Sequence, residues 1–225
     1  MIRKIIVTDD NSKSIYVESL NETYHSTHGA LQEAQHVFIE HGLKSAQIKK
    51  NVKIFEMGFG TGLNAILSIV YCLENNLPLY YIGVEKFPLT EYEIEQVNST
   101  HLPALKKYSA LYKQIHAIPY HKDVEMAPGI VLKKIHGDVQ SVHLPLNFFT
   151  LIYYDAFGPK IQPELWSAHV MKKMHQLLIP EGKLVTYCAQ GQFRRNLKEA
   201  GFRVERLPGP KGKREITSAT KSSEL

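Results

Sequence analysis

The chain has 225 residues, 44% of them hydrophobic, and a formal net charge of +5, values that suit one α/β domain with a modest appendage. No stretch approaches the roughly eighteen apolar residues of a membrane-spanning helix, and no apolar leader follows Met1. Cys72 and Cys188 lie far apart in apolar runs, which indicates free thiols of a reducing compartment. His25 and His28 have the spacing of a metal pair but lack a third ligand, so no metal is expected. We expect a cytoplasmic protein without membrane contact.

The first 48 residues are expected to form an extension that packs on a main domain of residues 49–225. Residues 2–8 and 14–18 are rich in β-formers and flank a polar turn, a pattern that predicts a β-hairpin. Apolar residues then recur at helical spacing at Leu31, Ala34, Val37 and Phe38.

The stretch from residue 52 to residue 64 organises the rest of the chain. Residues 52–56 predict a buried strand and residues 62–74 a helix, joined by the turn Gly58-Phe59-Gly60-Thr61-Gly62. The spacing does not fit the dinucleotide fingerprint, and no Lys-Ser or Lys-Thr follows as in a P-loop. Glu-x-Gly-x-Gly-x-Gly is the pattern of class I S-adenosylmethionine methyltransferases. A purely structural glycine turn is the alternative for the motif alone.

Two acids follow the next predicted strands. Residues 79–85 predict a strand ending at Glu85, which lies 23 residues beyond Gly62, the spacing at which a second-strand carboxylate meets a ribose diol. A helix-capping acid before Pro88 is the alternative. Residues 130–135 predict a third strand, after which Asp138 could accept from an adenine amino group or simply form a Gly-Asp turn.

Helices are predicted between these strands and a loop after them. Residues 88–98 predict a helix with its proline in the first turn, and residues 103–116 predict another. The stretch from residue 117 to residue 129, with prolines at 119 and 128, is expected to be a loop.

The continuous apolar run of residues 148–154 predicts a central strand that ends at Asp155. A carboxylate leaving a buried strand is costly unless it has a task or a partner, which makes Asp155 a catalytic candidate. The remaining pattern predicts a helix over 163–178, a strand over 183–189, a helix over 191–200 and an antiparallel pair, 202–206 with 214–219.

The positive charge is concentrated at the C-terminus. From residue 191 onward there are nine basic and four acidic residues, and nine minus four equals the whole net charge of +5. This edge is a candidate footprint for a polyanion, although a solvated surface would also produce such a bias.

Four stretches together resemble the methyltransferase domain of the MnmC family. They are residues 56–64, residues 85–90, residues 155–166, and residues 193–197 followed by 200–202 and 212–215. Tyr24-His25-Ser26, with Leu31, Glu33, Val37 and Phe38, is similar to the family's N-terminal signature. The family completes 5-methylaminomethyl-2-thiouridine at the wobble position of certain tRNAs. Ala156 and Gln162 stand where the family often has Gly and Asn, both conservative changes.

The resemblance implies a Rossmann-like, seven-stranded class I fold and S-adenosylmethionine as cofactor, with no FAD and no metal. The implied cofactor-binding residues are Glu56, Gly58, Gly60, Thr61, Gly62, Asn64, Glu85, Lys86 and Asp138. Asp155 would bind the substrate amine and either take its proton or orient the amine and stabilise the cationic product. Phe157 could stack on the extruded base or form a hydrophobic plug under the loop. The residues expected to contact the tRNA anticodon arm are Lys160, Arg194, Arg195, Lys213 and Arg214.

The bifunctional members carry an additional FAD-dependent oxidoreductase domain, which we do not expect in this chain, so a separate oxidoreductase could act upstream. Two alternatives remain open at this point. One is a methyltransferase of the same fold acting on a small-molecule amine, and the other is a non-catalytic RNA-binding relative.

Overall fold

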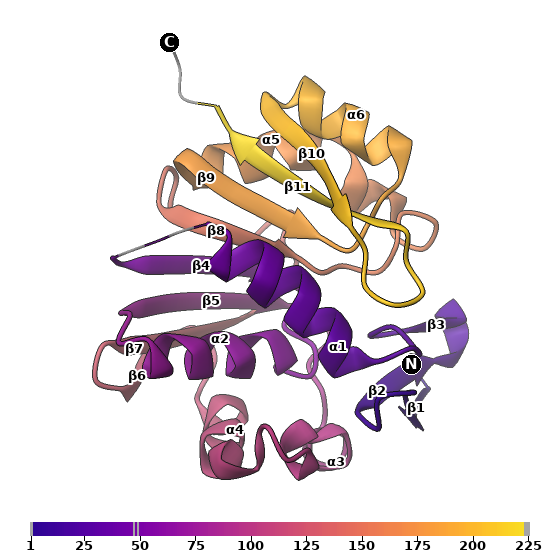
Figure 1. The fold of residues 1–225 in the computed structure, drawn as a ribbon, viewed down its shortest axis with the longest axis vertical. Helices are drawn as coiled ribbons and strands as arrows, with labels where there is room; N and C mark the ends of the chain where they lie inside the picture. Colours follow the sequence, from indigo (N-terminus) through magenta and orange to yellow (C-terminus); the bar gives the residue numbers. More distant parts are fainter. Residues whose placement is uncertain (1, 47, 49, 223–225) are drawn as a thin grey trace.

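The computed structural model describes residues 2–46, 48 and 50–222, and its ribbon is drawn in Figure 1. Its central feature is an eight-stranded sheet of order β10-β11-β9-β8-β4-β5-β7-β6. The strands are β4 (Val52–Met57), β5 (Leu79–Glu85), β6 (Asp123–Ala127), β7 (Ile130–His136), β8 (Phe149–Tyr154), β9 (Leu178–Thr186), β10 (Phe202–Pro208) and β11 (Glu215–Lys221). β4, β5, β7, β8 and β9 pair in parallel, while β6, β10 and β11 are antiparallel to their neighbours.

The predicted class I fold is confirmed, with one strand more than expected. Seven strands have the predicted layout, and β6 adds an eighth at the edge beside β7, within residues expected to be a loop. Only Met126 of β6 is buried, so this edge strand lacks the apolar pattern that marks the central ones.

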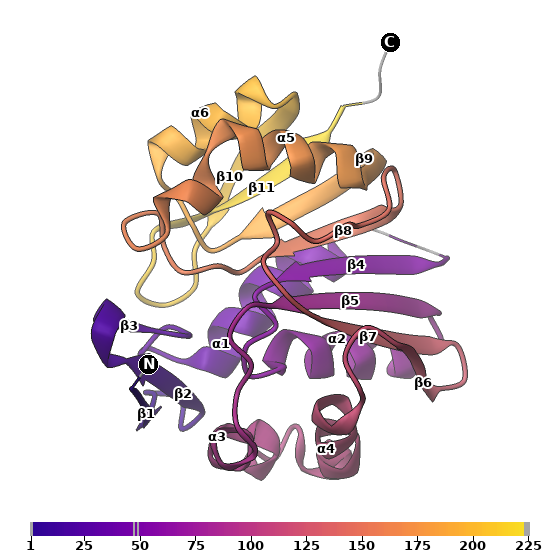
Figure 2. The same cartoon turned by 180° about the vertical axis from the view of Figure 1, so that it is seen from behind.

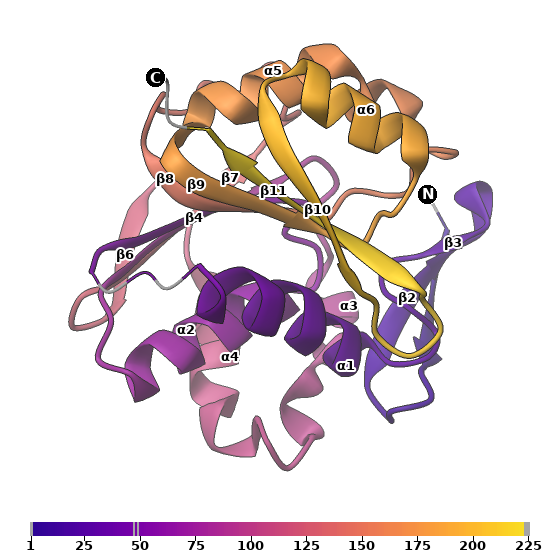
Figure 3. The same ribbon diagram turned by 45° about the horizontal axis from the view of Figure 1, so that its top comes forward.

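Helices cover both faces of this sheet (Figure 3). On one face lie α5 (Ala168–Leu177) and α6 (Gly191–Glu199); on the other lie α1 (Ala30–Ala34), the π-helix η2 (Gln35–Lys44), α2 (Leu63–Glu74) and α4 (Ser109–Ala117). Alternating strand residues supply the two cores: Tyr153 packs toward the α2 side and Tyr154 toward the α5 side. α3 (Glu91–Val97) lies beside α4, as seen from behind in Figure 2.

The predicted N-terminal hairpin is confirmed and gains a short third strand. β1 (Arg3–Val7), β2 (Lys13–Val17) and β3 (Glu22–Thr23) form a separate antiparallel sheet of order β1-β2-β3. This sheet lies off the carboxyl ends of the central strands (Figure 1). Its position makes it a wall of the site.

Several boundaries differ from the sequence-based ones. α3 begins after the N-cap Thr90 rather than at Pro88, because Thr90 and Glu93 form a capping box. The helix expected over 163–178 is divided, since Ser167 caps a new start for α5. β9 begins at Leu178 because a bulge, with Glu181 at φ +60°, absorbs the turn expected at 180–182. The 3₁₀ turns are η1 (Glu18–Leu20), η3 (Ser99–His101), η4 (Lys106–Tyr108) and η5 (Pro163–Trp166).

Among the described residues, no helix combines the length and the apolar character needed to cross a bilayer.

Candidate active site

A cavity of about 400 Å³ opens at the carboxyl ends of β4, β5 and β8. In open α/β sheets this edge is where ligands bind. The opposite wall comes from the N-terminal extension, through residues 22–27 and Glu33. Sequence segments far apart therefore meet around one cavity.

The glycine-rich turn forms the floor of the cavity beside Asp155. Gly58 has φ +91°, and a Cβ added there would lie 2.5 Å from the Asp155 carbonyl oxygen, so only glycine fits between these two strand ends. Below the turn, the Tyr112 hydroxyl donates to the Thr61 carbonyl, and His116 Nε2 lies 3.1 Å from the same oxygen. Of the predicted turn residues, Gly58, Gly60 and Thr61 line the cavity, and Gly62 lies beneath it.

Glu85, at the end of β5, is held by the turn and by its own loop. Its Oε2 accepts from Gly60 N at 2.9 Å, and its Oε1 accepts from Phe87 N at 2.8 Å. Next to it, Lys86 Nζ pairs with Asp138 Oδ2 at 2.9 Å across the cavity rim. The pKa of Asp138 is lowered by this lysine and by the Gln140 N–H. The structure thus brings Glu85, Lys86 and Asp138, three of the predicted cofactor residues, to one side of the cavity.

Two further carboxyl groups, those of Asp155 and Glu56, lie on the other side of the cavity. Asn64 Nδ2 donates to Asp155 Oδ2 at 2.8 Å and to Glu56 Oε1 at 2.9 Å, so a single amide joins two carboxyl groups. Glu56 is 1% exposed and lies behind the cavity wall, where burial and the nearby Asp155 raise its pKa well above the usual range. Burial, followed by the charge of Glu33, raises the pKa of Asp155 to about 7. A carboxyl group of this kind can exchange a proton near neutral pH.

An ion pair that the sequence did not reveal lies beside Asp155. Glu33 of α1 pairs with Lys213 of the β10–β11 loop, and both side chains line the cavity. The Lys213 ammonium also lies 4.0 Å from the centroid of the Tyr187 ring. Glu33 opposes ionisation of Asp155, while Lys213 favours it. The N-terminal signature contains Glu33, which is the signal that could have found it.

His25 is a second wall residue without a predicted role. Its Nδ1 lies 3.1 Å from Ser14 Oγ and its Nε2 lies 3.3 Å from Thr61 Oγ1, so the ring joins the N-terminal sheet to the glycine turn. Burial lowers the pKa of His25 to about 4, which leaves the ring neutral at physiological pH. Within the described residues, no cluster of His, Cys, Asp and Glu is arranged to hold a metal ion.

Phe157 lines the cavity, as its predicted role near the substrate requires. Its ring meets Tyr24 edge to face at 5.3 Å between centroids, and its carbonyl accepts from Trp166 Nε1 at 2.8 Å. Trp166 is buried and fixes the loop from below. An aromatic pair from two distant segments therefore forms one lip of the cavity.

A second depression, of about 670 Å³, adjoins the cavity and is more open to solvent. The two share Glu22, Gly158, Tyr187 and Lys213, so Lys213 lies at their junction. We call this depression the basic groove; the basic residues that line it are Lys160, Arg194, Arg206, Lys213 and Arg214.

Two of the predicted tRNA contacts are not supported by the structure. Arg194 is 7% exposed, and its guanidinium donates inward to Thr217 Oγ1, Glu215 Oε2 and the Ile216 carbonyl. These bonds leave Arg194 to fasten α6 to β11, not to hold a phosphate. Arg195 is exposed but bonds Gln192 and lies outside the groove. The contact predicted for Arg194 stays a prediction that these bonds do not favour, because a buried guanidinium needs its partners inside the fold.

The composition of the cavity fits S-adenosylmethionine. Six carboxyl groups and two ammonium groups line it: Glu22, Glu33, Glu85, Asp138, Asp155 and Glu164, with Lys86 and Lys213. An electronegative cavity of this kind favours a ligand that carries a sulfonium and an ammonium against a single carboxylate.

The strand order, the glycine turn and the flanking acids define a class I methyltransferase. A family model for "S-adenosyl-L-methionine-dependent methyltransferase" matches residues 95–222, more than half of the chain. The chain therefore belongs to this family of S-adenosyl-L-methionine-dependent methyltransferases, and the resemblance found in the sequence is confirmed.

Curated relatives and a solved structure support the same family assignment. The chain is 32% identical over 208 residues to the tRNA 5-methylaminomethyl-2-thiouridine biosynthesis bifunctional protein MnmC of Ralstonia nicotianae, covering 88% of this chain and 32% of that protein. The Cupriavidus necator protein of the same description is 33% identical, with 91% and 32% covered. The chain thus spans about a third of the length of these relatives. The crystal structure of MNMC2 from Aquifex aeolicus is similar with a TM-score of 0.82 and 25% identity, covering 100% of this chain and 72% of that one.

Proposed function

We propose that this methyltransferase acts on tRNA, converting the 5-aminomethyl group of a wobble (2-thio)uridine to 5-methylaminomethyl. The observation that carries the proposal is the position of Asp155. Its carboxyl group faces the cavity beside the glycine turn and has a pKa of about 7, and this cavity adjoins a groove lined by basic side chains. The description of the MnmC relatives supports the choice of substrate.

The cofactor would lie along the floor of the cavity. Gly58, Gly60 and Thr61 would face its methionine part, Glu85 the ribose hydroxyls and Asp138 the adenine amino group. The N-terminal end of α2 reaches the cavity through Leu63 and Asn64, an orientation that favours a carboxylate. When bound, S-adenosylmethionine would supply the methyl group of its sulfonium. The C–S bond breaks as this methyl group is transferred, and the electron pair of that bond stays on sulfur.

The chain's own residues would position the amine and manage its proton. The nitrogen must present a lone pair to form the new N–C bond, so it has to be the free amine, and it sheds one proton as the bond forms. Asp155 would accept a hydrogen bond from this nitrogen and take the proton directly or through water. Asn64 holds the carboxyl group in place, and Phe157 with Tyr24 would pack on the extruded base.

The basic groove would receive the RNA backbone. The groove meets the cavity at Lys213, and it is lined by Lys160, Arg206 and Arg214. These cations would suit the phosphates on either side of a nucleotide inserted into the cavity. This groove favours a polyanionic substrate over a free small amine. The reaction would take place in the cytoplasm, and a separate FAD-dependent oxidoreductase stays the expected source of the aminomethyl group.

A direct assay tests the proposal. The purified chain is incubated with S-adenosylmethionine and two tRNA preparations, one carrying 5-aminomethyl-uridine at the wobble position and one carrying unmodified uridine. Mass analysis of the nucleosides should show one added methyl group on the first tRNA alone. A chain that binds S-adenosylhomocysteine but methylates neither tRNA would refute the substrate and leave the family assignment intact.

The RNA footprint can be tested separately. Lys160→Ala with Arg214→Ala should weaken tRNA binding and reduce the slope of log K against log salt by about 1.4–1.8, since each phosphate contact contributes about 0.7–0.9. Lys172→Ala is the control, because Lys172 is exposed on α5 and pairs with Glu199 away from the groove. Filter binding at several salt concentrations measures both quantities. An unchanged slope in the double variant would place the footprint elsewhere.

A further inference from the structure

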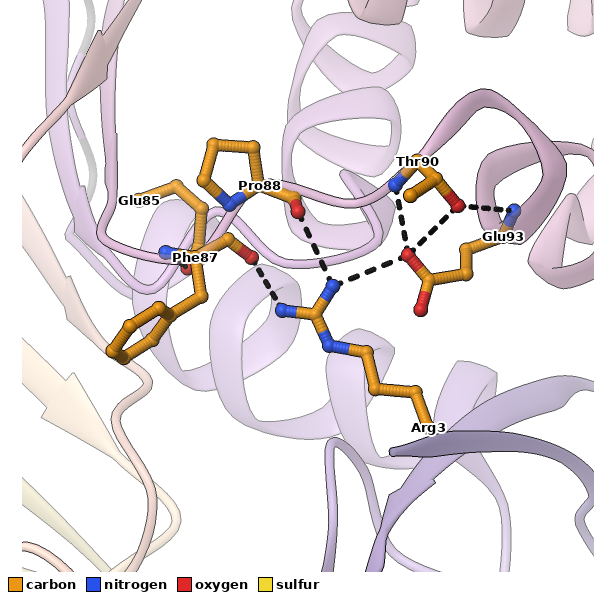
Figure 4. Close-up of polar contacts among 6 residues, drawn as sticks. All are labelled: Arg3, Glu85, Phe87, Pro88, Thr90 and Glu93. Carbon is orange, nitrogen blue, oxygen red and sulfur yellow. Dashed lines mark hydrogen bonds and ion pairs between the residues drawn. The ribbon is translucent and has the colours of Figure 1, made fainter. Parts of the chain in front are cut away.

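Arg3 of the N-terminal sheet inserts its guanidinium into the loop that follows β5 (Figure 4). One terminal nitrogen donates to the Phe87 carbonyl at 2.7 Å, and the other lies 3.2 Å from the Pro88 carbonyl and 3.1 Å from Glu93 Oε2. The Arg3 side chain is only 9% exposed. Two carbonyl groups of this loop and one carboxylate of α3 thus compensate a nearly buried charge.

The loop that Arg3 holds begins with the proposed ribose carboxylate. Phe87 N donates to Glu85 Oε1, and Gly60 N donates to Glu85 Oε2, so the Glu85 carboxylate is fixed from both sides. At the other end of the loop, Glu93 closes the capping box with Thr90 and also accepts from Arg3. A single arginine therefore fixes the path of the backbone from Phe87 to the start of α3.

Tyr24 extends the same contact into the cavity. The Arg3 guanidinium carbon lies 5.9 Å from the centroid of the Tyr24 ring. The ring lies against the glycine turn, since a Cβ added to Gly60 would be 3.3 Å from Tyr24 Cδ2. The N-terminal extension thus supports both partners of the Glu85–Gly60 hydrogen bond. Arg3 holds the loop after Glu85, and Tyr24 lies against Gly60.

We propose that Arg3 is a positioning residue for the cofactor. By holding the 87–88 carbonyls it keeps Glu85 aimed into the cavity before the cofactor binds, which spares the ligand the cost of ordering that loop. The N-terminal sheet is then part of the cofactor site and not only a support for the substrate. This inference rests on the proposed role of Glu85, and it needs no assumption about the tRNA.

The experiment measures the dissociation constant of S-adenosylhomocysteine by calorimetry, without tRNA. Arg3→Ala should weaken binding about tenfold, and Arg3→Lys should recover only part of the loss, because an ammonium cannot reproduce the planar fork. The control is Lys4→Ala, on the same strand, whose exposed ion pair with Glu18 does not reach the cavity. Thermal melting of each variant confirms that it is folded.

A double-mutant cycle separates positioning from a general loss of structure. In the Glu85→Gln background, Arg3→Ala should cost much less affinity than in the wild type, because its effect passes through Glu85. An unchanged dissociation constant, or equal losses in both backgrounds, would overturn the proposal. Failure of the tRNA assay alone would count against the substrate and not against Arg3.

Discussion

The two ends of the cavity each present a carboxyl group at the end of a parallel strand next to β4, yet the two groups are built differently. Glu85, after β5, accepts two backbone N–H groups, one from the glycine turn and one from its own loop. Asp155, after β8, is held by one side-chain amide and lies near the charge of Glu33. The same position in the fold therefore produces two different chemical environments.

This difference suits the two acids to the different tasks proposed for them. A carboxylate fixed by two N–H donors is a rigid acceptor, which suits binding of a diol. A carboxyl group whose pKa burial raises to about 7 can pick up and release a proton under physiological conditions, which suits a proton acceptor in catalysis. Substitution of the two acids should therefore impair different steps: methyl transfer for Asp155 and cofactor binding for Glu85.

The largest effect is expected for Asp155→Asn. Methyl transfer should fall about 10²–10⁴-fold, because the variant can hold the amine but cannot take its proton. Binding of S-adenosylhomocysteine should stay within about twofold of the wild type, since Asp155 lies at the far end from Glu85. Single-turnover rates and calorimetry measure the two quantities. Wild-type turnover in this variant would remove Asp155 from the chemistry.

The same variant should be more stable than the wild type at neutral pH. The pKa of Asp155 is about 7 in the folded chain against an ordinary value of 3.8. Between these two pH values the folded chain binds a proton that the unfolded chain does not, so stability falls as the pH rises from 4 to 7. Asp155→Asn removes this loss, worth about 2–4 kcal/mol above pH 7. Denaturant unfolding should show a gain of at most about 1 kcal/mol at pH 4.5 and a clearly larger gain at pH 8.

A smaller effect, and a different kind, is expected for Glu85→Gln. The amide keeps one acceptor but loses the charge, so cofactor affinity should fall about 10–100-fold. At saturating cofactor, kcat should remain within a few-fold of the wild type. Steady-state kinetics with varied S-adenosylmethionine separates the two parameters. A loss confined to kcat would mean that Glu85 and Asp155 do not divide the work as proposed.

The sequence located the residues of the proposed cofactor site more completely than the surroundings of the proposed catalytic acid. The turn, Glu85 and Asp138 belong to consecutive strand–loop units, so strand periodicity and spacing are enough to place them at one sheet edge. Asp155 was also found, because an acid directly after an apolar strand is conspicuous. Its surroundings were not: Glu33 lies on α1 and Lys213 on the β10–β11 loop, and only the folded chain brings them together.

Charge counting was the weakest guide. The excess of basic residues after residue 191 is real, but a charge count could not show that Arg194 points inward to β11. Lys160 lies before that segment, so the family resemblance and not the charge count pointed to it, and it lines the groove. Nor could it show the strand β6 or the π-helix, since an edge strand and a π-helix share their patterns with loops and α-helices.

Substitutions in the Glu33–Lys213 pair should give the smallest effect, but the two variants should shift the pH profile in opposite directions. Glu33 raises the pKa of Asp155 and Lys213 lowers it, so Glu33→Gln should move the acidic limb of the kcat–pH profile down, and Lys213→Met should move it up. Each shift should be about 0.5–1 pH unit. The control is Lys44→Met, whose exposed i,i+4 pair with Glu40 lies away from the cavity and should leave the profile unchanged. Because the two variants break the same ion pair, a purely structural role would shift both profiles alike; only an electrostatic action on Asp155 moves them in opposite directions.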